Sequence, residues 1–308
     1  MNFDSRPLLL ASVAPRFRRY RVLRTLELAG SHEVVLAVSE GPFGFERTVV
    51  IKRLLPGFEV APAMLRSLAR DAMAYAGLTH PAIVRMYDFF AVNSRPAMVL
   101  EYIDGRSLRR VLELPTTLPR PAALHVGARV FAALASAHSA TDAKTGKPSP
   151  VVHRHVCPST VLITRAGDVK LSDFGFARLV GGTRDGRSGL VAMGYVAPEQ
   201  ARGEEATPRT DLYCASLLVR ELLAGRPRFV PGETTHAALL EQMENPRLVP
   251  MATACADLPA DVAAALDCAL APDPRERTID AEELQRILRA ATDRGQGQRA
   301  LADALERI

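Results

Sequence analysis

The first part of the chain alternates apolar and polar positions in the way that strands do. Three runs within residues 20–56, YRVLRTLEL, HEVVLAVSE and ERTVVIKRLL, are rich in β-forming residues and are separated by glycine-containing breaks. We expect a meander of three short strands here. The runs IVRMYDFFAV and PAMVLEYI predict two further strands before residue 103.

Between these strand patterns, residues 61–78 change to helical spacing. The apolar residues of this segment share one stripe of the expected helix, formed by Met64, Leu65, Leu68, Ala72 and Tyr75. The helix should end at His80-Pro81, because the residue before a proline is disfavoured in the helical region.

After Asp104-Gly105 the pattern becomes mainly helical, over residues 107–114, 120–140, 211–225, 258–271 and 280–291. The sequence therefore predicts an α+β fold with a small β-rich N-terminal lobe, residues 19–103, and a larger helical C-terminal lobe, residues 104–291. An N-terminal extension, residues 1–18, precedes this domain, and a helical tail, residues 292–308, follows it. Leu301, Leu305 and Ile308 share one face of that tail, which either packs on its own lobe or binds a partner.

The composition is that of an ordinary globular protein. Of 308 residues, 48% are hydrophobic and 24% are charged, which excludes wholesale disorder. No apolar run reaches the length that crosses a bilayer. The first residues place an acid before a short apolar patch and basic residues after it, the reverse of a secretory signal. We therefore expect a cytoplasmic protein with no membrane segment.

Charge and cysteine content argue against two further classes of protein. A net charge of +5 is spread along the chain, so we expect no nucleic-acid partner. The basic string RFRRYR at 16–21 is either a solvated extension or a phosphate-binding arm. The four cysteines form no CxxC pair, which favours reduced thiols over disulfides or a zinc knuckle.

A series of motifs resembles the protein kinase domain over about residues 20–290, and the bacterial Ser/Thr branch in particular. In chain order these are VVIK, LTHPAIVRMYDF, VLEYIDGRSL, VVHRHVCPSTVLI, VKLSDFGFAR, GYVAPEQ, DLYCAS and DPRERT. The resemblance implies a two-lobed kinase fold. It also implies that Lys52 lies on the third strand, that Asp71 is its carboxylate partner, and that Asp173 is a magnesium ligand.

Several nucleotide-site positions depart from the family pattern. Glu27, Ala29 and His32 stand where the phosphate-covering glycines would fall, and Gly30 alone remains nearby. A carboxylate at residue 27 would repel a polyphosphate. Val50 replaces a small residue against the adenine, and overfilling such a slot costs about 1–3 kcal/mol. We therefore expect weak binding of ATP and Mg²⁺, or none.

The catalytic positions depart further. The resemblance places His155 at the general base, where a carboxylate is usual, and Thr160 at the second metal ligand, where Asn is usual. Cys157 replaces a Lys or Ser, and Ala192 replaces a supporting Thr. We expect loss of phosphoryl transfer, since losing a positioned base alone costs roughly 10²–10⁴-fold.

The structural positions of the resemblance are retained. Glu199 and Arg277 match a buried ion pair, and Asp211 matches a buried carboxylate that holds the catalytic-loop backbone. The positions that stack into a spine are Tyr75, Met86, His153 and Phe174. One mild departure is Ser216, where Gly is usual.

The same residues allow other interpretations. His153, His155 and Cys157 alternate as zinc ligands can, yet no fourth ligand is evident nearby. Cys157 as a nucleophile has equally little support, because most isolated thiols are inert. The glycines of VGGTRDGRSG (180–189) lack the strand–loop–helix context of a phosphate loop, so an activation loop explains them better.

These observations lead to one hypothesis with two alternatives. The chain is predicted to be a pseudokinase that binds another signalling protein or an active kinase. The first alternative is an atypical Ser/Thr kinase with His155 as base and Asp173 alone on the metal, whose activity should fall as pH drops through the histidine range. The second is a switch that binds ATP through Lys52 and Asp173 without turnover.

Overall fold

The computed structural model describes residues 20–28, 31–113, 117–142, 144–175, 194–225, 236–292 and 295–306. The expected extension, Ala29, Gly30, the glycine-rich segment 180–189 and Ala192 lie outside these residues. The described chain has the expected α+β fold and divides into two compact units. The first holds the described residues up to Arg70 together with Arg85–Tyr102, and the second holds Asp71–Val84 and the described residues from Ile103 onward.

The first unit is built on a five-stranded antiparallel sheet of order β1-β2-β3-β5-β4. Its strands are β1 (Tyr20–Leu28), β2 (His32–Glu40), β3 (Glu46–Leu54), β4 (Met86–Val92) and β5 (Arg95–Glu101). A 3₁₀ turn, Pro42–Gly44, joins β2 to β3. All five strands were expected from the alternating pattern.

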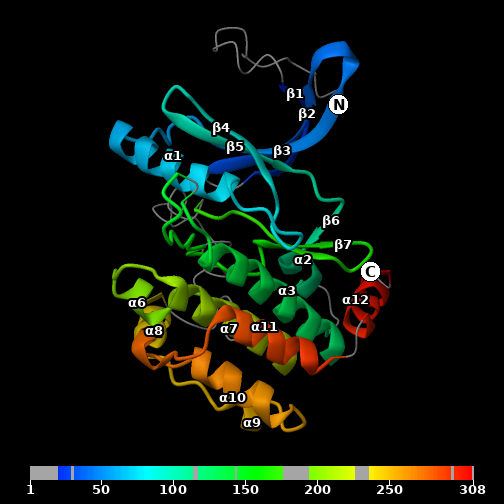
Figure 1. The fold of residues 1–308 in the computed structure, drawn as a ribbon, viewed down its shortest axis with the longest axis vertical. Helices are drawn as coiled ribbons and strands as arrows, with labels where there is room; N and C mark the ends of the chain where they lie inside the picture. The colour runs from blue at the N-terminus through cyan, green and yellow to red at the C-terminus, as the bar shows by residue number, and fades with distance from the viewer. Residues whose placement is uncertain are drawn as a thin grey trace. The chain divides into compact units, whose positions relative to one another are not determined.

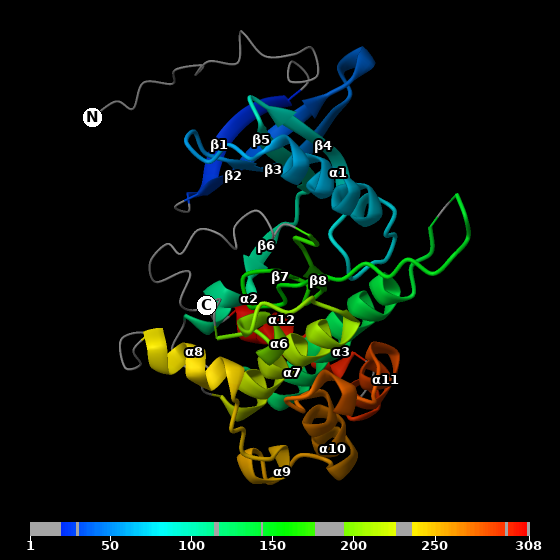
Figure 2. The same ribbon diagram turned by 90° about the vertical axis from the view of Figure 1, so that its left-hand side faces the viewer.

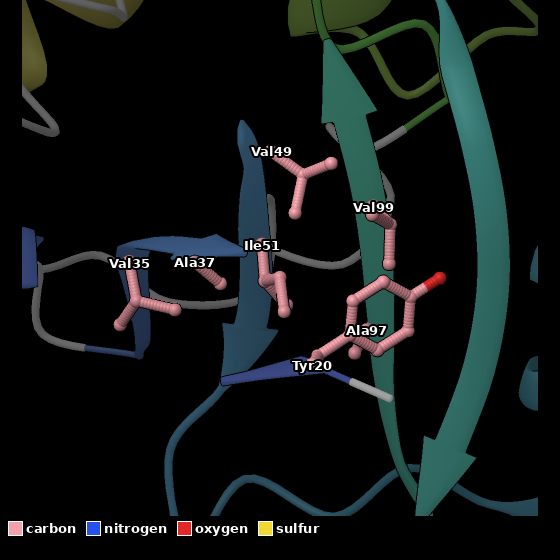
Figure 3. Close-up of a cluster of buried hydrophobic side chains, with 7 residues drawn as sticks. All are labelled: Tyr20, Val35, Ala37, Val49, Ile51, Ala97 and Val99. Atoms are coloured by element: carbon pink, nitrogen blue, oxygen red, sulfur yellow. The ribbon is translucent and has the colours of Figure 1, made fainter. Parts of the chain in front are cut away.

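One face of this sheet carries its hydrophobic core. The side chains of Tyr20, Val35, Ala37, Val49, Ile51, Ala97 and Val99 form this cluster (Figure 3). Tyr20 comes from β1, and the other six come from alternate positions on β2, β3 and β5, as the period of two predicted. At the cluster's edge the Tyr20 hydroxyl donates to Asp88 Oδ2 at 3.1 Å. The opposite face of β3 therefore presents Val50 and Lys52.

Helix α1 (Pro62–Ala76) follows the sheet strand β3 in sequence and is shared by the two units. Leu68, Ala72 and Tyr75 of the expected stripe are buried. Met64, which shares the apolar stripe, is 39% exposed. Met64 lies in the first turn of the helix, before the buried positions begin.

The second unit is mainly helical and also contains three short strands. In chain order its elements are β6 (Gly105–Ser107), α2 (Leu108–Leu112), α3 (Arg120–His138), β7 (Val161–Thr164), β8 (Val169–Leu171), α6 (Pro198–Ala201), α7 (Pro208–Ala224), α8 (His236–Glu244), α9 (Met251–Ala254), α10 (Ala260–Ala269), the 3₁₀ turn Pro274–Glu276, α11 (Ala281–Ala290) and α12 (Gln296–Glu306). Helix α3 packs against α7, α11 and α12, and α9 lies beside α10 (Figure 1 and Figure 2). The interior of α3 is apolar on most sides, as expected for a helix covered by several neighbours.

The three-stranded sheet β6-β7-β8 was not expected from the sequence. Strands of three and four residues are too short to show a period. The short helices α6 and α9, and helix α8, were also missed. For the tail, α12 packs on α3 with Leu301 fully buried, while Ile308 lies outside the described residues.

No helix in the described part of the chain is both long and apolar enough to cross a bilayer. The four cysteines carry free thiols, two of them buried, Cys157 and Cys214.

Candidate functional site

The segment VVHRHVCPST lies in the second unit between α3 and β7, and its backbone is held by one buried carboxylate. Asp211, from the first turn of α7, accepts from the amides of His153 and Arg154, both at 2.7 Å. His138, at the end of α3, lies 2.9 Å from the same carboxylate. These bonds hold Arg154 at φ 68°, a left-handed conformation that side chains other than glycine rarely adopt.

His153 is fully buried and connects this loop to the strand β8. Its Nε2 lies 2.7 Å from the Ser172 carbonyl, and its Nδ1 accepts from the His155 amide at 3.2 Å. Because one nitrogen must donate and the other accept, the imidazole is neutral. Burial lowers the pKa of His153 to about 4, although Asp211 and the Ser172 carbonyl act in the opposite direction.

The aromatic residues expected to stack are brought together within this unit. Phe174 lies between Tyr75, at 5.2 Å between ring centroids, and His153, at 4.5 Å. The Tyr75 hydroxyl donates to the Val84 carbonyl at 2.6 Å. Met86 belongs to the first unit, so its place in such a spine stays a prediction.

His155, which the resemblance assigns to the general-base position, interacts with a neighbouring thiol. The imidazole of His155 hydrogen-bonds the side chain of Cys157, which is buried. Burial raises the pKa of this thiol, but the charge and hydrogen bond of His155, together with the Ser159 and Thr160 amides, leave it below its ordinary value. The side chains at 155 and 157 therefore form a local imidazole–thiol pair.

Thr160, which the resemblance assigns to the second metal-ligand position, is also engaged within the loop. Thr160 is 3% exposed, and its hydroxyl lies 2.9 Å from the Cys157 carbonyl and 3.2 Å from the His155 carbonyl. The same oxygen accepts from the Cys157 amide at 3.2 Å. Thr160 thus closes the turn that precedes β7.

The retained carboxylate Asp173 follows β8 and is 6% exposed, with its backbone at φ 71°. No group of three or more His, Cys, Asp or Glu side chains in the described residues is placed to share a metal ion. Asp173 is therefore the carboxylate on which a magnesium site would depend.

Asp71 contacts the segment VVHRHVCPST at Arg154. Its Oδ2 lies 3.9 Å from Arg154 Nη1, and both side chains are less than one-third exposed. A Cβ on Gly175 would lie 3.2 Å from the Asp71 Cβ. The helix α1 is thus packed closely on the Asp-Phe-Gly segment at this residue. Asp71 and Lys52 belong to different units, and their pairing stays a prediction.

In the first unit, Lys52 occupies a cross-strand row on the face opposite the core cluster. It pairs with Val34 on β2 and Met98 on β5, and Val34 pairs with Glu27 on β1. Directly paired residues of antiparallel strands share a face, so Glu27 lies on the Lys52 face about 10 Å away, two strand spacings. Val50 lies on this face between Leu36 and Leu100.

A buried ion pair lies between α6 and the turn before α11. Arg277 donates to both Glu199 oxygens, at 2.7 and 3.0 Å, and is fully buried. Three carbonyls, those of Arg209, Ala271 and Pro272, satisfy its remaining donors. Burial would raise the pKa of Glu199, but Arg277 holds it below its usual value.

Two contacts at the site have no clear sequence signal. Gln200 donates to the Arg154 carbonyl at 2.8 Å and so ties α6 to the loop. The Tyr195 hydroxyl hydrogen-bonds Glu221 of α7, and burial raises the pKa of both groups. Only the adjacency of Gln200 to the APE string could have suggested the first contact.

Comparison with known proteins decides the family. The model of the protein kinase domain matches residues 45–288. The chain belongs to the protein kinase family. It is 33% identical to the tyrosine-protein kinase MasK of Myxococcus xanthus, over 85% of this chain and 41% of that protein. It is 30% identical to the serine/threonine-protein kinase PrkC of Bacillus subtilis, over 89% of this chain and 41% of that one.

Solved structures agree with this assignment. The kinase domain of Mycobacterium tuberculosis PknI superposes with a TM-score of 0.66 at 25% identity, covering 89% of this chain and 96% of that domain. The chain spans about two-fifths of the length of the curated relatives it matches. These matches confirm the resemblance to bacterial kinases that the motifs indicated.

Proposed function

We propose that this chain is a protein-kinase-fold module impaired in phosphoryl transfer, which acts in the cytoplasm by binding another signalling protein or an active kinase. The observation that carries the proposal is that the side chains at the general-base and second metal-ligand positions are engaged within their own loop.

The base position lacks the carboxylate that phosphoryl transfer uses to accept a hydroxyl proton and orient the nucleophile. His155 is directed to the buried Cys157 thiol, and its charge stabilises the thiolate form. An imidazole held in this way is poorly placed to accept a proton from a substrate hydroxyl. This supports loss of the base function.

The metal position supports the same conclusion. Magnesium prefers oxygen ligands in an octahedral arrangement, and carboxylate or amide oxygens usually supply them. The Thr160 hydroxyl is buried and already bonded to two carbonyls and one amide of the loop. Holding a metal through Thr160 would require these bonds to be given up, which leaves Asp173 as the main ligand.

Nucleotide binding is weakened at two further positions. Glu27 places a carboxylate in the same cross-strand row as Lys52, where it opposes a polyphosphate. Val50 adds bulk to the face that would meet the adenine. A switch that binds ATP without turnover would have to overcome both effects through Lys52 and Asp173.

An active Ser/Thr kinase is a second candidate, favoured by the intact scaffold around the loop. Asp211 holds the loop backbone, Arg277 binds Glu199, and Asp173 and Lys52 are retained. The relatives at 30–33% identity are also named as kinases. If the chain is an active kinase, the His155 imidazole turns away from Cys157 and accepts the proton of the substrate hydroxyl.

The variant His155→Asp/Thr160→Asn separates the two candidates. If the scaffold is intact and only these side chains are missing, transfer of phosphate from ATP should rise about 10²-fold over the wild-type chain. Adding Lys52→Ala to this variant is the control and should abolish the gain. Robust wild-type transfer that the double substitution does not improve would support the active kinase instead. A thermal-shift titration with ATP tests the switch, since a site that binds no ATP shows no rise in melting temperature.

A further inference from the structure

Helix α12 lies outside the residues matched by the protein kinase family model, which end at 288. It is nevertheless part of the packed second unit. Leu301 is fully buried, and α12 packs against α3 (Figure 1). Such burial is typical of a built interface and not of a loose tail.

Two glycines permit a close approach of α12 to its neighbours. A Cβ on Gly297 would lie 2.6 Å from the Pro121 carbonyl oxygen and 2.6 Å from the His125 Cβ. A Cβ on Gly167, in the turn between β7 and β8, would lie 2.3 Å from the Gln298 carbonyl oxygen. Gly167 also has φ +77°, which favours glycine independently. Both positions therefore accept no larger residue without displacing α12.

Side-chain hydrogen bonds then fix α12 to the β7–β8 turn. Gln298 Nε2 donates to the Ala166 carbonyl and to Asp168 Oδ1, both at 3.0 Å. From the other side, His125 Nε2 lies 3.2 Å from the Gly167 carbonyl. The turn is thus held between α3 and α12 through the backbone of two successive residues.

The far end of α12 borders the same small sheet. A cavity of about 410 Å³ is lined by Leu305 and Glu306 of α12 and by Arg106, Ile163 and Arg165 of the β6–β7 region. The helix therefore runs along the sheet from the β7–β8 turn to the β6–β7 pair.

The β7–β8 hairpin connects this interface to the candidate site. Its tip is the turn held by α12, and its base is Thr160 and Ser172, where the Ser172 amide and hydroxyl both donate to the Thr160 carbonyl at 2.8 and 3.1 Å. Asp173 follows directly. Four residues of strand separate tip and base, about 13 Å.

We propose that α12 is a clamp on the β7–β8 hairpin and that Gln298 is a positioning residue for Thr160 and Asp173. Releasing the tip loosens the hairpin and, through it, the two site residues at its base. A partner that displaces α12 thereby acts on the site from a distant surface. The clamp would act in the same way whether or not the chain transfers phosphate.

Hydrogen exchange at individual amides of the full chain tests this clamp. Gln298→Leu should accelerate exchange at least tenfold at both Gly167, at the tip, and Ser172, at the base, while amides of α7 stay unchanged. The matched control is Gln296→Leu, an exposed glutamine on the same helix, which should change neither amide. Acceleration at Gly167 without Ser172, or confined to α12, would overturn the positioning role.

A second pair of variants, at residues 298 and 168, keeps the test decisive if Gln298→Leu fails to fold. Gln298→Glu places a carboxylate against Asp168 and should loosen the hairpin in the same way. Adding Asp168→Asn supplies an amide donor to that carboxylate and should restore part of the slow exchange at Ser172, since the bond to the Ala166 carbonyl stays lost. Absence of rescue would contradict a role for this specific contact.

Discussion

His153 is a buried neutral imidazole that joins three parts of the second unit. It accepts from the His155 amide, hydrogen-bonds the Ser172 carbonyl and contacts the Phe174 ring. Protonation would place a charge in a fully buried position, where desolvation outweighs the attraction of Asp211. The folded state therefore disfavours the protonated form, and this preference links stability to pH.

The sign of that linkage follows from the direction of the pKa shift. The pKa of His153 is lowered from 6.5 to about 4 on folding. Its contribution to stability is complete above pH 6.5 and is lost as pH falls toward 4. Between pH 7.5 and 5.0 we expect a loss of about 2 kcal/mol from this residue. Urea unfolding of wild type and His153→Gln at both pH values checks this, because the glutamine variant should lose less stability. Equal losses in the two proteins would contradict the account.

Residue types at the site were readable from the sequence, but their orientations were not. The motif order located Asp211, Glu199 and Arg277, because each lies at a fixed place in a recognisable string. The direction of His155 toward Cys157 depends on side-chain rotamers within a short loop. The sequence carries no periodic signal for such a contact.

At the scale of elements, α1 and the loop 151–160 are joined by a polar contact. Asp71 lies 3.9 Å from Arg154, whose own backbone is bound by Asp211 and Gln200. The resemblance implies that Asp71 pairs with Lys52, so Arg154 is a second candidate partner of this carboxylate. A helix tied to the loop in this way is less able to move independently of it.

A double-mutant cycle measures this contact. Asp71→Asn and Arg154→Gln should each destabilise the fold, and the two effects should be non-additive by about 0.5–1 kcal/mol, as expected for a partly exposed pair. The cycle is read by urea unfolding at pH 7.5. The matched control pairs Arg154→Gln with Arg70→Gln, one residue earlier on α1, and should be additive. Additivity in the Asp71 cycle would show that the contact contributes nothing.

Long periodic elements were predicted well, and short ones were not. The five strands of the first unit and helices α3, α7, α10 and α11 follow patterns of several turns or pleats. Strands β6, β7 and β8 have three or four residues and are formed by pairing with one another. Tertiary pairing of this kind leaves little trace in the local sequence.

At the scale of the whole molecule, a retained kinase scaffold carries altered catalytic positions. The buried Glu199–Arg277 pair and the Asp211 hydrogen bonds maintain the second unit. The changes at 155 and 160 occur inside that scaffold and are absorbed by local hydrogen bonds. This distribution is what we expect of the proposed function, in which the fold is kept for binding and phosphoryl transfer is impaired.

Transfer of the γ-phosphate of labelled ATP is the most direct test of this account. The wild-type chain and Lys52→Ala should be incubated with ATP and either Mg²⁺ or Mn²⁺, and labelling of the chain and of an added protein substrate should be measured. The account predicts no labelling by wild type above that of Lys52→Ala. Wild-type labelling that Lys52→Ala abolishes would contradict it.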